Sequence, residues 1–227
     1  MQNKKNYTDG SESHLAPIFI LGVRGRSGTH FLFDLLSLHP DCAQSVISED
    51  FFMNQGGVLI KCANAIYNNW PRHWRVRITP IDSLYRCLGD SLVSFLNLQL
   101  NRKLSAETPT ANFEPDDLRK LSPKRLVTKS PSVDENLPLF FKLFPQAYLL
   151  IIVRDGRAVV ESLVKSFDCS YEVEIRRWAN AVRILLQFEE EIKNTNYKCL
   201  IVKYEDVYNQ TEQELRRIFS FLGSSKG

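Results

Sequence analysis

Residues 18–36 of this 227-residue chain read IFILGVRGRSGTHFLFDLL. An apolar run is followed by a glycine-rich turn at 24–27 and then by a segment whose apolar residues recur at helical spacing. A strand, a glycine-rich turn and a helix in this order are typical of a loop that binds phosphate, because the free N–H groups at the start of the helix attract an anion. We therefore expect a strand over 17–23, a helix over 28–38 and a phosphate site between them.

The loop lacks the lysine that is typical of loops binding nucleoside triphosphates. Such a loop ends in Gly-Lys followed by Ser or Thr, and the lysine contacts the β- and γ-phosphates. Here Gly28 precedes Thr29, and the cation lies further back, at Arg26. The sequence therefore points away from ATP or GTP and toward another phosphorylated donor.

A second strand–turn–helix unit follows later in the chain. Residues 147–153 read AYLLIIV, and residues 154–157 read RDGR before a helix that we expect over 158–167. Arg154 lies at the end of this strand, and Ser162 lies two helical turns further on. A forked guanidinium and a hydroxyl suit a phosphate group. Two such units predict a donor with two separate phosphate groups.

The remaining pattern alternates strands with helices. The expected strands are 43–48, 125–128 and 198–203, and the expected helices are 83–100, 134–144, 172–194 and 211–222. Residues 56–115 read as irregular apart from the helix at 83–100. Alternating elements predict an α/β fold with three layers, in which helices cover both faces of a central parallel sheet. Ligands of such sheets bind beyond the carboxyl ends of the strands.

The composition favours a globular protein and excludes several other classes. A net charge of +3 is too small to predict a nucleic-acid partner. No run approaches the ~20 apolar residues of a membrane span. Residues 1–14 are expected to be a disordered polar tail, without the apolar centre of a signal peptide, before a single domain over 15–227. The five cysteines stand at no metal-ligand or redox spacing, which predicts a cytoplasmic protein without a metal site.

Four segments resemble sulfotransferases that use 3′-phosphoadenosine 5′-phosphosulfate, most of all the tyrosylprotein sulfotransferases and also the Golgi-type carbohydrate sulfotransferases. RSGT at 26–29 resembles the loop for the 5′-phosphosulfate, and HPD follows at 39–41. KSP at 129–131 resembles the lysine–x–proline turn of the family, and VRDGRA at 153–158 resembles its 3′-phosphate segment. The resemblance covers 17–50 and 125–223, and it implies a three-layer α/β/α fold of the P-loop-like kind.

The resemblance also implies which residues bind the donor. The residues that would hold the 5′-phosphosulfate are Arg26, Ser27, Gly28, Thr29 and, through its backbone N–H, His30. Arg154 and Ser162 would bind the 3′-phosphate, and Tyr204 would contact the nucleotide.

The resemblance further implies the catalytic roles. Lys129, together with Arg26, would neutralise the charge that develops on the bridging oxygen as the bond to sulfur breaks. Glu49 would take the proton from the acceptor hydroxyl, and its neighbour Asp50 is an equally good choice for this base. No metal ion is needed for this chemistry. The acceptor would be a hydroxyl of a small molecule, a carbohydrate or a peptide.

Two other functions stay open at this point. A nucleotide-dependent small-molecule kinase would need Mg²⁺ and normally a loop lysine. A module that binds the nucleotide without turnover is suggested by the C-terminus, where the sequence stops short of the segment that closes over the nucleotide in relatives and Lys226 could be its remnant. Residues 51–124 are expected to form a variable acceptor-side insert. Within it, WPRHWRVR at 70–77 could bind a sugar or an acidic acceptor, or could be a structural loop, and Arg24 has no assignable role.

Overall fold

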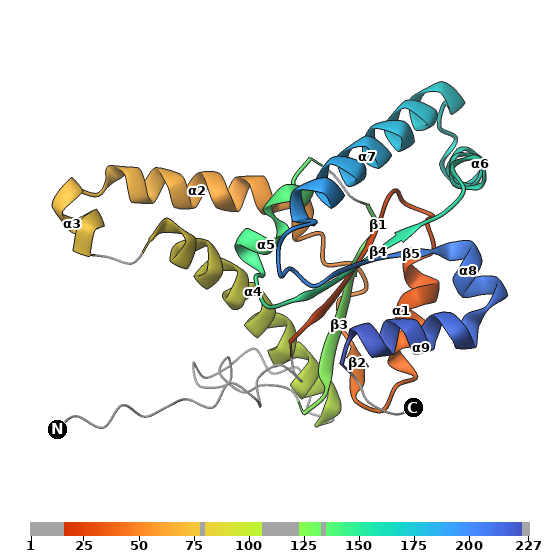
Figure 1. The fold of residues 1–227 in the computed structure, drawn as a ribbon, viewed down its shortest axis with the longest axis horizontal. Coiled ribbons are helices and arrows are strands. Elements are labelled where there is room, and N and C mark those ends of the chain that lie inside the picture. Colours follow the sequence, from red (N-terminus) through yellow and green to blue (C-terminus); the bar gives the residue numbers. More distant parts are fainter. Residues whose placement is uncertain (1–15, 78–79, 106–122, 133–134, 224–227) are drawn as a thin grey trace.

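The computed structural model in Figure 1 describes residues 16–77, 80–105, 123–132 and 135–223. Its centre is a sheet of five parallel strands, in the order β2-β3-β1-β4-β5. Their bounds are β1 (Ile18–Gly22), β2 (Cys42–Gln44), β3 (Arg125–Ser130), β4 (Tyr148–Val153) and β5 (Cys199–Lys203). The predicted tail at 1–14 and Lys226 lie outside the described residues.

Helices cover both faces of this sheet, which confirms the predicted three-layer α/β fold. The helices in the described part of the chain are α1 (Thr29–Ser37), η2 (Met53–Gln55), α2 (Gly56–Asn69), α3 (Arg72–Arg77), α4 (Ile81–Leu104), η4 (Leu137–Leu139), α5 (Phe140–Leu143), α6 (Gly156–Phe167), α7 (Tyr171–Ile192), α8 (Tyr204–Asn209) and α9 (Thr211–Phe221). One face of the sheet packs against α1, α8 and α9. The other packs against α4, α5 and α7.

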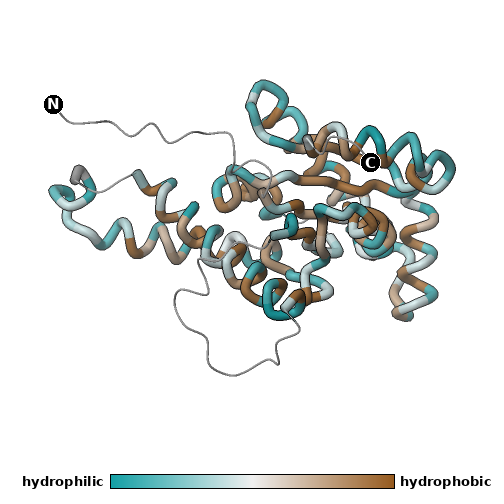
Figure 2. Tube along the Cα trace, turned by 90° about the horizontal axis from the view of Figure 1, so that it is seen from below, coloured by the Kyte–Doolittle hydropathy of each residue, from teal (hydrophilic) through white to brown (hydrophobic). Residues whose placement is uncertain are grey.

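The alternation of side chains along β1 explains how one short strand contributes to both layers. Ile18 and Ile20 are fully buried in the core beneath α1 and α9, whereas Phe19 and Leu21 are buried in the core beneath α5 and α7. A central parallel strand is covered on both faces, so it reads as a continuous apolar run. Figure 2 shows these hydrophobic residues gathered along the sheet in the middle of the molecule.

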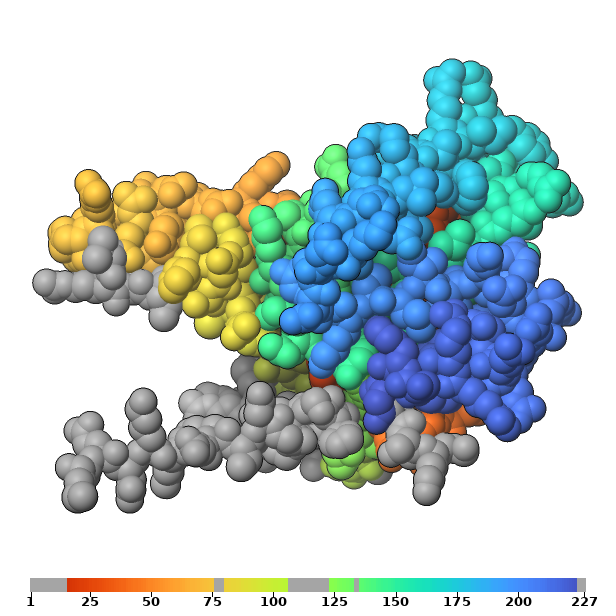
Figure 3. All heavy atoms as spheres, in the orientation of Figure 1, coloured from red at the N-terminus to blue at the C-terminus, as the bar shows by residue number. Residues whose placement is uncertain are grey.

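The segment at 56–104 differs from its prediction, because it is largely helical rather than irregular. Helices α2 and α3 and the first part of α4 form an arm that projects from the body of the molecule, as Figures 1 and 3 show, whereas the end of α4 packs near β3. Helix α4 was expected, but it is longer than predicted. Helix α2 opens with two glycines and buries only Gly56, Ile60 and Ala63. Both features weaken the helical pattern in the sequence, since glycine disfavours helix and the apolar stripe is short.

Other differences are smaller. Strand β2 has three residues and ends well before Ser48, and α8 was not expected. The helix predicted over 134–144 consists of the short elements η4 and α5, and its first residue lies outside the described residues. Helix α6 begins at Gly156, earlier than predicted, because the side chain of Asp155 accepts a hydrogen bond from the N–H of Arg157 and caps the helix.

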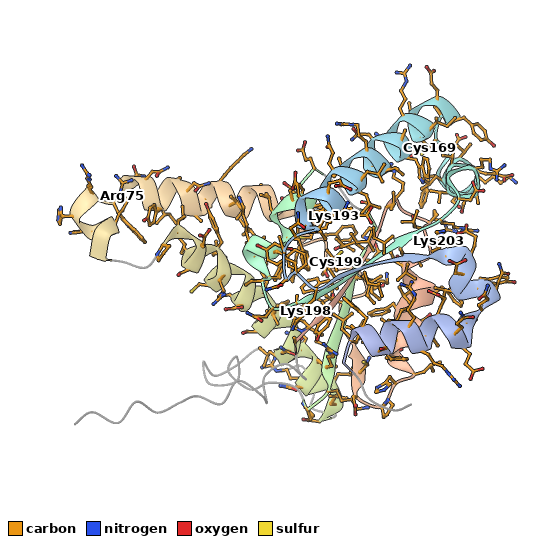
Figure 4. All side chains as sticks on the ribbon, viewed as in Figure 1. Arg75, Cys169, Lys193, Lys198, Cys199 and Lys203 are labelled. Atoms are coloured by element: carbon orange, nitrogen blue, oxygen red, sulfur yellow. The ribbon has the colours of Figure 1, made fainter. Side chains whose placement is uncertain are left out.

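All five cysteines are free thiols. Figure 4 shows Cys169 and Cys199 well apart, and burial raises the pKa of Cys199 to about 12, so that it stays a neutral thiol. Within the described ranges, none of the helices combines the length and the hydropathy needed to cross a membrane.

A buried arginine joins the two ends of the described chain. Arg125, at the start of β3, is 3% exposed. Its Nε donates to the carbonyl of Ala16 at 2.7 Å and its Nη1 to the carbonyl of Leu222 at 2.8 Å. The guanidinium also lies 4.3 Å from the ring centroid of Tyr148. The first described residues and the end of α9 are therefore fixed at one point of the sheet.

The contact between α4 and α5 gives the first prediction. A Cβ atom on Gly89 would lie 1.9 Å from the carbonyl oxygen of Leu143, which is backbone and cannot move aside cheaply. We expect Gly89→Ala to lower the free energy of unfolding by about 1–3 kcal/mol, the usual cost of overpacking. Chemical denaturation measures this change. The control is Cys87→Ala at an exposed position of the same helix, and equal stabilities of the two variants would contradict the packing argument.

Candidate active site

Two hydrogen bonds between Arg24 and Ser27 close the phosphate loop, defined here as residues 22–30. The N–H of Arg24 donates to Ser27 Oγ at 3.1 Å, and the N–H of Ser27 donates back to the carbonyl of Arg24 at 3.2 Å. Ser27 is fully buried. The loop also contains two left-handed residues, Arg26 with φ 70° and Gly28 with φ 98°. Ser27 thus shapes the loop with its side chain, and the backbone turns sharply around it.

This turn leaves the start of α1 open toward the carboxyl edge of the sheet. The N–H groups of the first helical residues, Thr29, His30 and Phe31, have no acceptor within the helix, and the helix dipole adds positive potential there. Gly28 is required at the preceding position. Its φ is left-handed, and a Cβ would lie 2.3 Å from the ring of Tyr204. The loop therefore has the geometry of an anion site.

The two units predicted from the sequence meet at this edge. Arg26 Nε donates to Ser162 Oγ at 3.0 Å, and Arg154 Nη1 donates to the carbonyl of Arg26 at 3.1 Å. The guanidinium of Arg154 also lies 4.4 Å from the ring centroid of Tyr204. Four of the candidate donor-binding residues therefore form one contiguous group, although they come from α6, α8 and two separate loops.

The two predicted catalytic residues lie beside each other. Lys129 Nζ donates to Glu49 Oε1 at 3.1 Å, and its side chain is 1% exposed while that of Glu49 is 35% exposed. The ammonium also lies 5.7 Å from the ring centroid of Phe33 on α1. Lys129 was expected in a turn, but it belongs to β3, where it is opposite Ile20 of β1. The strand makes its position rigid.

Asp50 has surroundings different from those of Glu49. Its carboxylate accepts hydrogen bonds from the hydroxyls of Ser130 at 2.5 Å and Thr128 at 2.7 Å, and from the N–H of Phe52 at 2.9 Å. Its own N–H donates to the carbonyl of Lys129 at 3.0 Å. Burial raises the pKa of Asp50 above its usual value, although these hydrogen bonds favour the charged form. Asp50 fixes the end of β3, whereas Glu49 faces solvent and Lys129.

Sequence reasoning missed the partner of Arg24. Arg24 Nε and Nη2 both donate to Glu174 Oε2, at 3.1 and 2.8 Å, and Arg177 Nη1 donates to Oε1 at 2.8 Å. Glu174 is 1% exposed. Burial alone would raise the pKa of Glu174, but the hydrogen bonds from Arg24 and Arg177 outweigh it and hold the pKa below its usual value. No local pattern could reveal a pair separated by 150 residues.

A hollow lies between α6 and α7. It has a volume of about 570 Å³ and is lined by Asp155, Gly156, Arg157, Val160, Glu161, Tyr171, Ile175 and Trp178. Positions 156, 157, 160 and 161 lie on the side of α6 opposite Ser162. Trp178 packs against Gly156 and lines this hollow, and Ile175 on the same helix is 54% exposed.

The aromatic and basic segment at 70–77 is not part of the candidate site. It follows α2 and forms α3 at the far end of the arm, and Figure 4 shows Arg75 there, away from the sheet. Trp74 is 51% exposed. Among the described residues, no group of three His, Cys, Asp or Glu side chains is placed to hold a metal ion.

The fold is that of a P-loop-like α/β protein, and its glycine-rich loop has the geometry of an anion site, with Arg154 next to it. More specifically, the chain belongs to the sulfotransferase family, because the model of the "Sulfotransferase family" matches residues 17–225. The family resemblance inferred from the sequence is therefore confirmed.

Curated relatives agree with this assignment. The chain is 31% identical over 231 residues to the "Protein-tyrosine sulfotransferase" of Drosophila melanogaster, an alignment that covers 97% of this chain and 40% of the relative. It is 24% identical over 212 residues to a "Putative protein-tyrosine sulfotransferase" of Caenorhabditis briggsae, covering 90% of this chain and 64% of the relative. The chain thus spans less than two thirds of the length of these relatives.

Solved structures show the same fold. The sulfotransferase domain from the olefin synthase of Synechococcus PCC 7002 aligns with a TM-score of 0.55 and 20% identity over 98% of this chain and 78% of that one. The sulfotransferase domain from the curacin biosynthetic pathway aligns with a TM-score of 0.55 and 18% identity, covering 93% of this chain and 75% of that one. At these identities the likeness concerns the fold alone.

The environment of Asp50 gives the second prediction. Asp50→Ala removes the acceptor of two buried hydroxyls and one N–H, so we expect the free energy of unfolding to fall by about 1–3 kcal/mol. Thermal and chemical denaturation measure the loss. The control is Ser48→Ala, an exposed position of the same segment. Unchanged stability of Asp50→Ala would show that this carboxylate does not fix the end of β3.

Proposed function

We propose that this protein transfers a sulfuryl group from 3′-phosphoadenosine 5′-phosphosulfate to a hydroxyl acceptor. The observation that carries the proposal is the contact of Arg26 in the phosphate loop with Ser162, beside Arg154. Two anion-binding units are adjacent there, with the Lys129–Glu49 pair as candidate catalytic residues. Membership of the sulfotransferase family supports the same reaction.

The residues present fit a donor with two phosphate groups. The N–H groups at the start of α1 and the side chain of Arg26 are suited to hold the 5′-phosphosulfate, because an anion at a helix N-terminus is stabilised by unpaired N–H groups and the helix dipole. Arg154 and Ser162 are suited to the 3′-phosphate, through a forked guanidinium and a hydroxyl. Tyr204, next to Arg154, offers an aromatic ring to the base. The bound donor would supply the sulfuryl group.

Lys129 is placed to neutralise charge on the leaving oxygen. Its buried ammonium has a fixed position, since it lies in the strand next to β1 and Asp50 fixes the strand end beside it. A cation held in place before the reaction needs no rearrangement to stabilise charge that develops in the transition state. Transfer of this kind depends mainly on positioning and electrostatics, and removing such a donor typically lowers the rate by about 10²–10³.

Glu49 is the better candidate for the base. Both carboxylate oxygens of Asp50 already accept hydrogen bonds from hydroxyls or from an N–H, and the side chain is buried. Glu49 is more exposed, so an acceptor hydroxyl can reach it, and its contact with Lys129 keeps its carboxylate near the reacting groups. Within hydrogen-bond reach, a carboxylate can accept the proton as the acceptor oxygen attacks sulfur.

We propose a peptide as the acceptor, with its tyrosine hydroxyl as the attacking group. The names of the relatives from Drosophila melanogaster and Caenorhabditis briggsae support this choice. Carbohydrates and small phenols are the alternatives that an acceptor screen tests. The kinase reading gains no support, since Gly28 occupies the position of the loop lysine. The cytoplasmic location stays a prediction.

The third prediction concerns the 3′-phosphate. We expect Arg154→Ala to weaken binding of 3′,5′-diphosphoadenosine about 10- to 100-fold, because one charge-assisted interaction with the 3′-phosphate is lost. Binding of adenosine 5′-phosphate, which lacks this group, should change about threefold at most. Calorimetric titration measures both, with Arg157→Ala as a control at an exposed arginine of the same segment. Equal losses for both nucleotides would remove Arg154 from this role.

The fourth prediction concerns the base. We expect Glu49→Gln to lower kcat about 10²- to 10⁴-fold, with labelled donor and a tyrosine peptide as substrates, and to leave donor affinity nearly unchanged. The matched variant is Asp50→Asn, which should lose stability and keep more activity. A kcat of Glu49→Gln equal to that of the wild type would refute the assignment of Glu49 as the base. Donor binding by the wild type without transfer to any acceptor in the screen would favour a binding module.

A further inference from the structure

Arg24 belongs to the phosphate loop by sequence, but its side chain does not face the anion site. Its Nε and Nη2 both donate to one oxygen of Glu174 on the first turn of α7. These two groups form the forked edge of the guanidinium that would otherwise bind a phosphate. Arg24 is therefore occupied by a carboxylate of the protein, and Arg26 faces Ser162 instead.

Glu174 is a buried carboxylate with two arginine partners. It is 1% exposed, whereas the side chains of Arg24 and Arg177 are 25% and 59% exposed. A buried charge is retained only where it is paired and hydrogen-bonded. Because Arg177 lies one turn away on the same helix, it could neutralise Glu174 without a partner from the loop. The bond to Arg24 adds a tie between α7 and the loop.

The loop needs such a tie because its backbone is not relaxed. Arg26 has a positive φ of 70°, which is unfavourable for a residue with a side chain. Arg24 begins the turn that contains Arg26. The backbone N–H and carbonyl of Arg24 make the two hydrogen bonds with Ser27. A residue fixed at its backbone by Ser27 and at its side chain by Glu174 holds the first half of the loop in one conformation.

We propose that Arg24 and Glu174 are positioning residues that hold the phosphate loop in the conformation that binds the donor. The inference rests on the proposed function, because it concerns the binding of that donor. The pair acts at the 5′ side of the nucleotide, through the loop, and its hydrogen bonds go to Ser27 and Arg177 rather than to Arg154 or Ser162, the proposed 3′-phosphate residues. Its effect is therefore common to nucleotides with and without a 3′-phosphate.

Arg24→Ala is the first variant for the test, because Glu174 keeps Arg177 as a partner and no buried charge is left alone. Glu174→Gln is the second, and the double variant completes the cycle. The control is Glu172→Gln, which breaks an exposed ion pair with Arg176 on the same turn of α7. We expect Arg24→Ala and Glu174→Gln each to weaken binding of 3′,5′-diphosphoadenosine and of adenosine 5′-phosphate about tenfold.

The double variant distinguishes positioning from direct binding. If the two residues act only through each other, the double variant binds no more weakly than either single variant. The KM for the acceptor stays unchanged. If Arg24 contacted the donor itself, Arg24→Ala would weaken binding while Glu174→Gln, which removes the negative charge that holds Arg24, would not. That result, or losses no larger than in Glu172→Gln, would overturn the proposal.

Hydrogen exchange of the free protein provides a readout that does not depend on the donor. We expect amides of residues 22–32 to exchange at least about tenfold faster in Arg24→Ala and Glu174→Gln, while amides of β4 and the melting temperature stay close to wild type. Unchanged hydrogen exchange in the loop would refute the positioning role of Arg24 and Glu174, even if nucleotide binding changed. Failure of the wild type to bind either nucleotide would contradict the proposed function and leave this exchange result to decide on the pair.

Discussion

The parallel pairing of β1 with β3 and β4 fixes the position of the candidate site residues on which the proposed chemistry depends. Ile20 is opposite Lys129, and Gly22 is opposite Ile152, so the ends of three strands lie at one edge of the sheet. The phosphate loop leaves β1 there, and Arg154 follows β4. A shift of one residue in register would move Lys129 to the other face of the sheet and disturb the packing on both faces. The same strand pairing therefore determines both the packing of the core and the geometry of the candidate site.

Two buried carboxylates, Asp50 and Glu174, support this edge from opposite sides in different ways. Asp50 accepts hydrogen bonds from two hydroxyls and an N–H, and it fixes the end of β3. Glu174 is paired with two arginines and joins α7 to the phosphate loop. Around the exposed Arg26, the framework is therefore held by buried carboxylates that are already hydrogen-bonded within the protein. This arrangement separates groups that maintain geometry from groups that remain accessible to ligands.

Much of the fold could be predicted, because β1, β4 and the loop between β1 and α1 are local patterns of apolar runs and glycines. The pairing of Arg26 with Ser162 was foreseen only as two neighbouring phosphate units, since parallel strands must end together. Helix α2 could not be predicted, because its apolar stripe is short. The choice between Glu49 and Asp50 depends on side-chain surroundings, and the partner of Arg24 lies 150 residues away. Such contacts have no signature in a single sequence.

The guanidinium of Arg125 has a consequence for the architecture as a whole. It binds the carbonyls of Ala16 and Leu222 together, so the two ends of the described domain meet at the edge of the sheet opposite the candidate site. A domain whose ends are adjacent can be inserted into a surface loop of another protein, or its ends can be joined and the chain reopened elsewhere, without moving the phosphate loop. Ala16 and Leu222 are therefore held at one point, away from the phosphate loop.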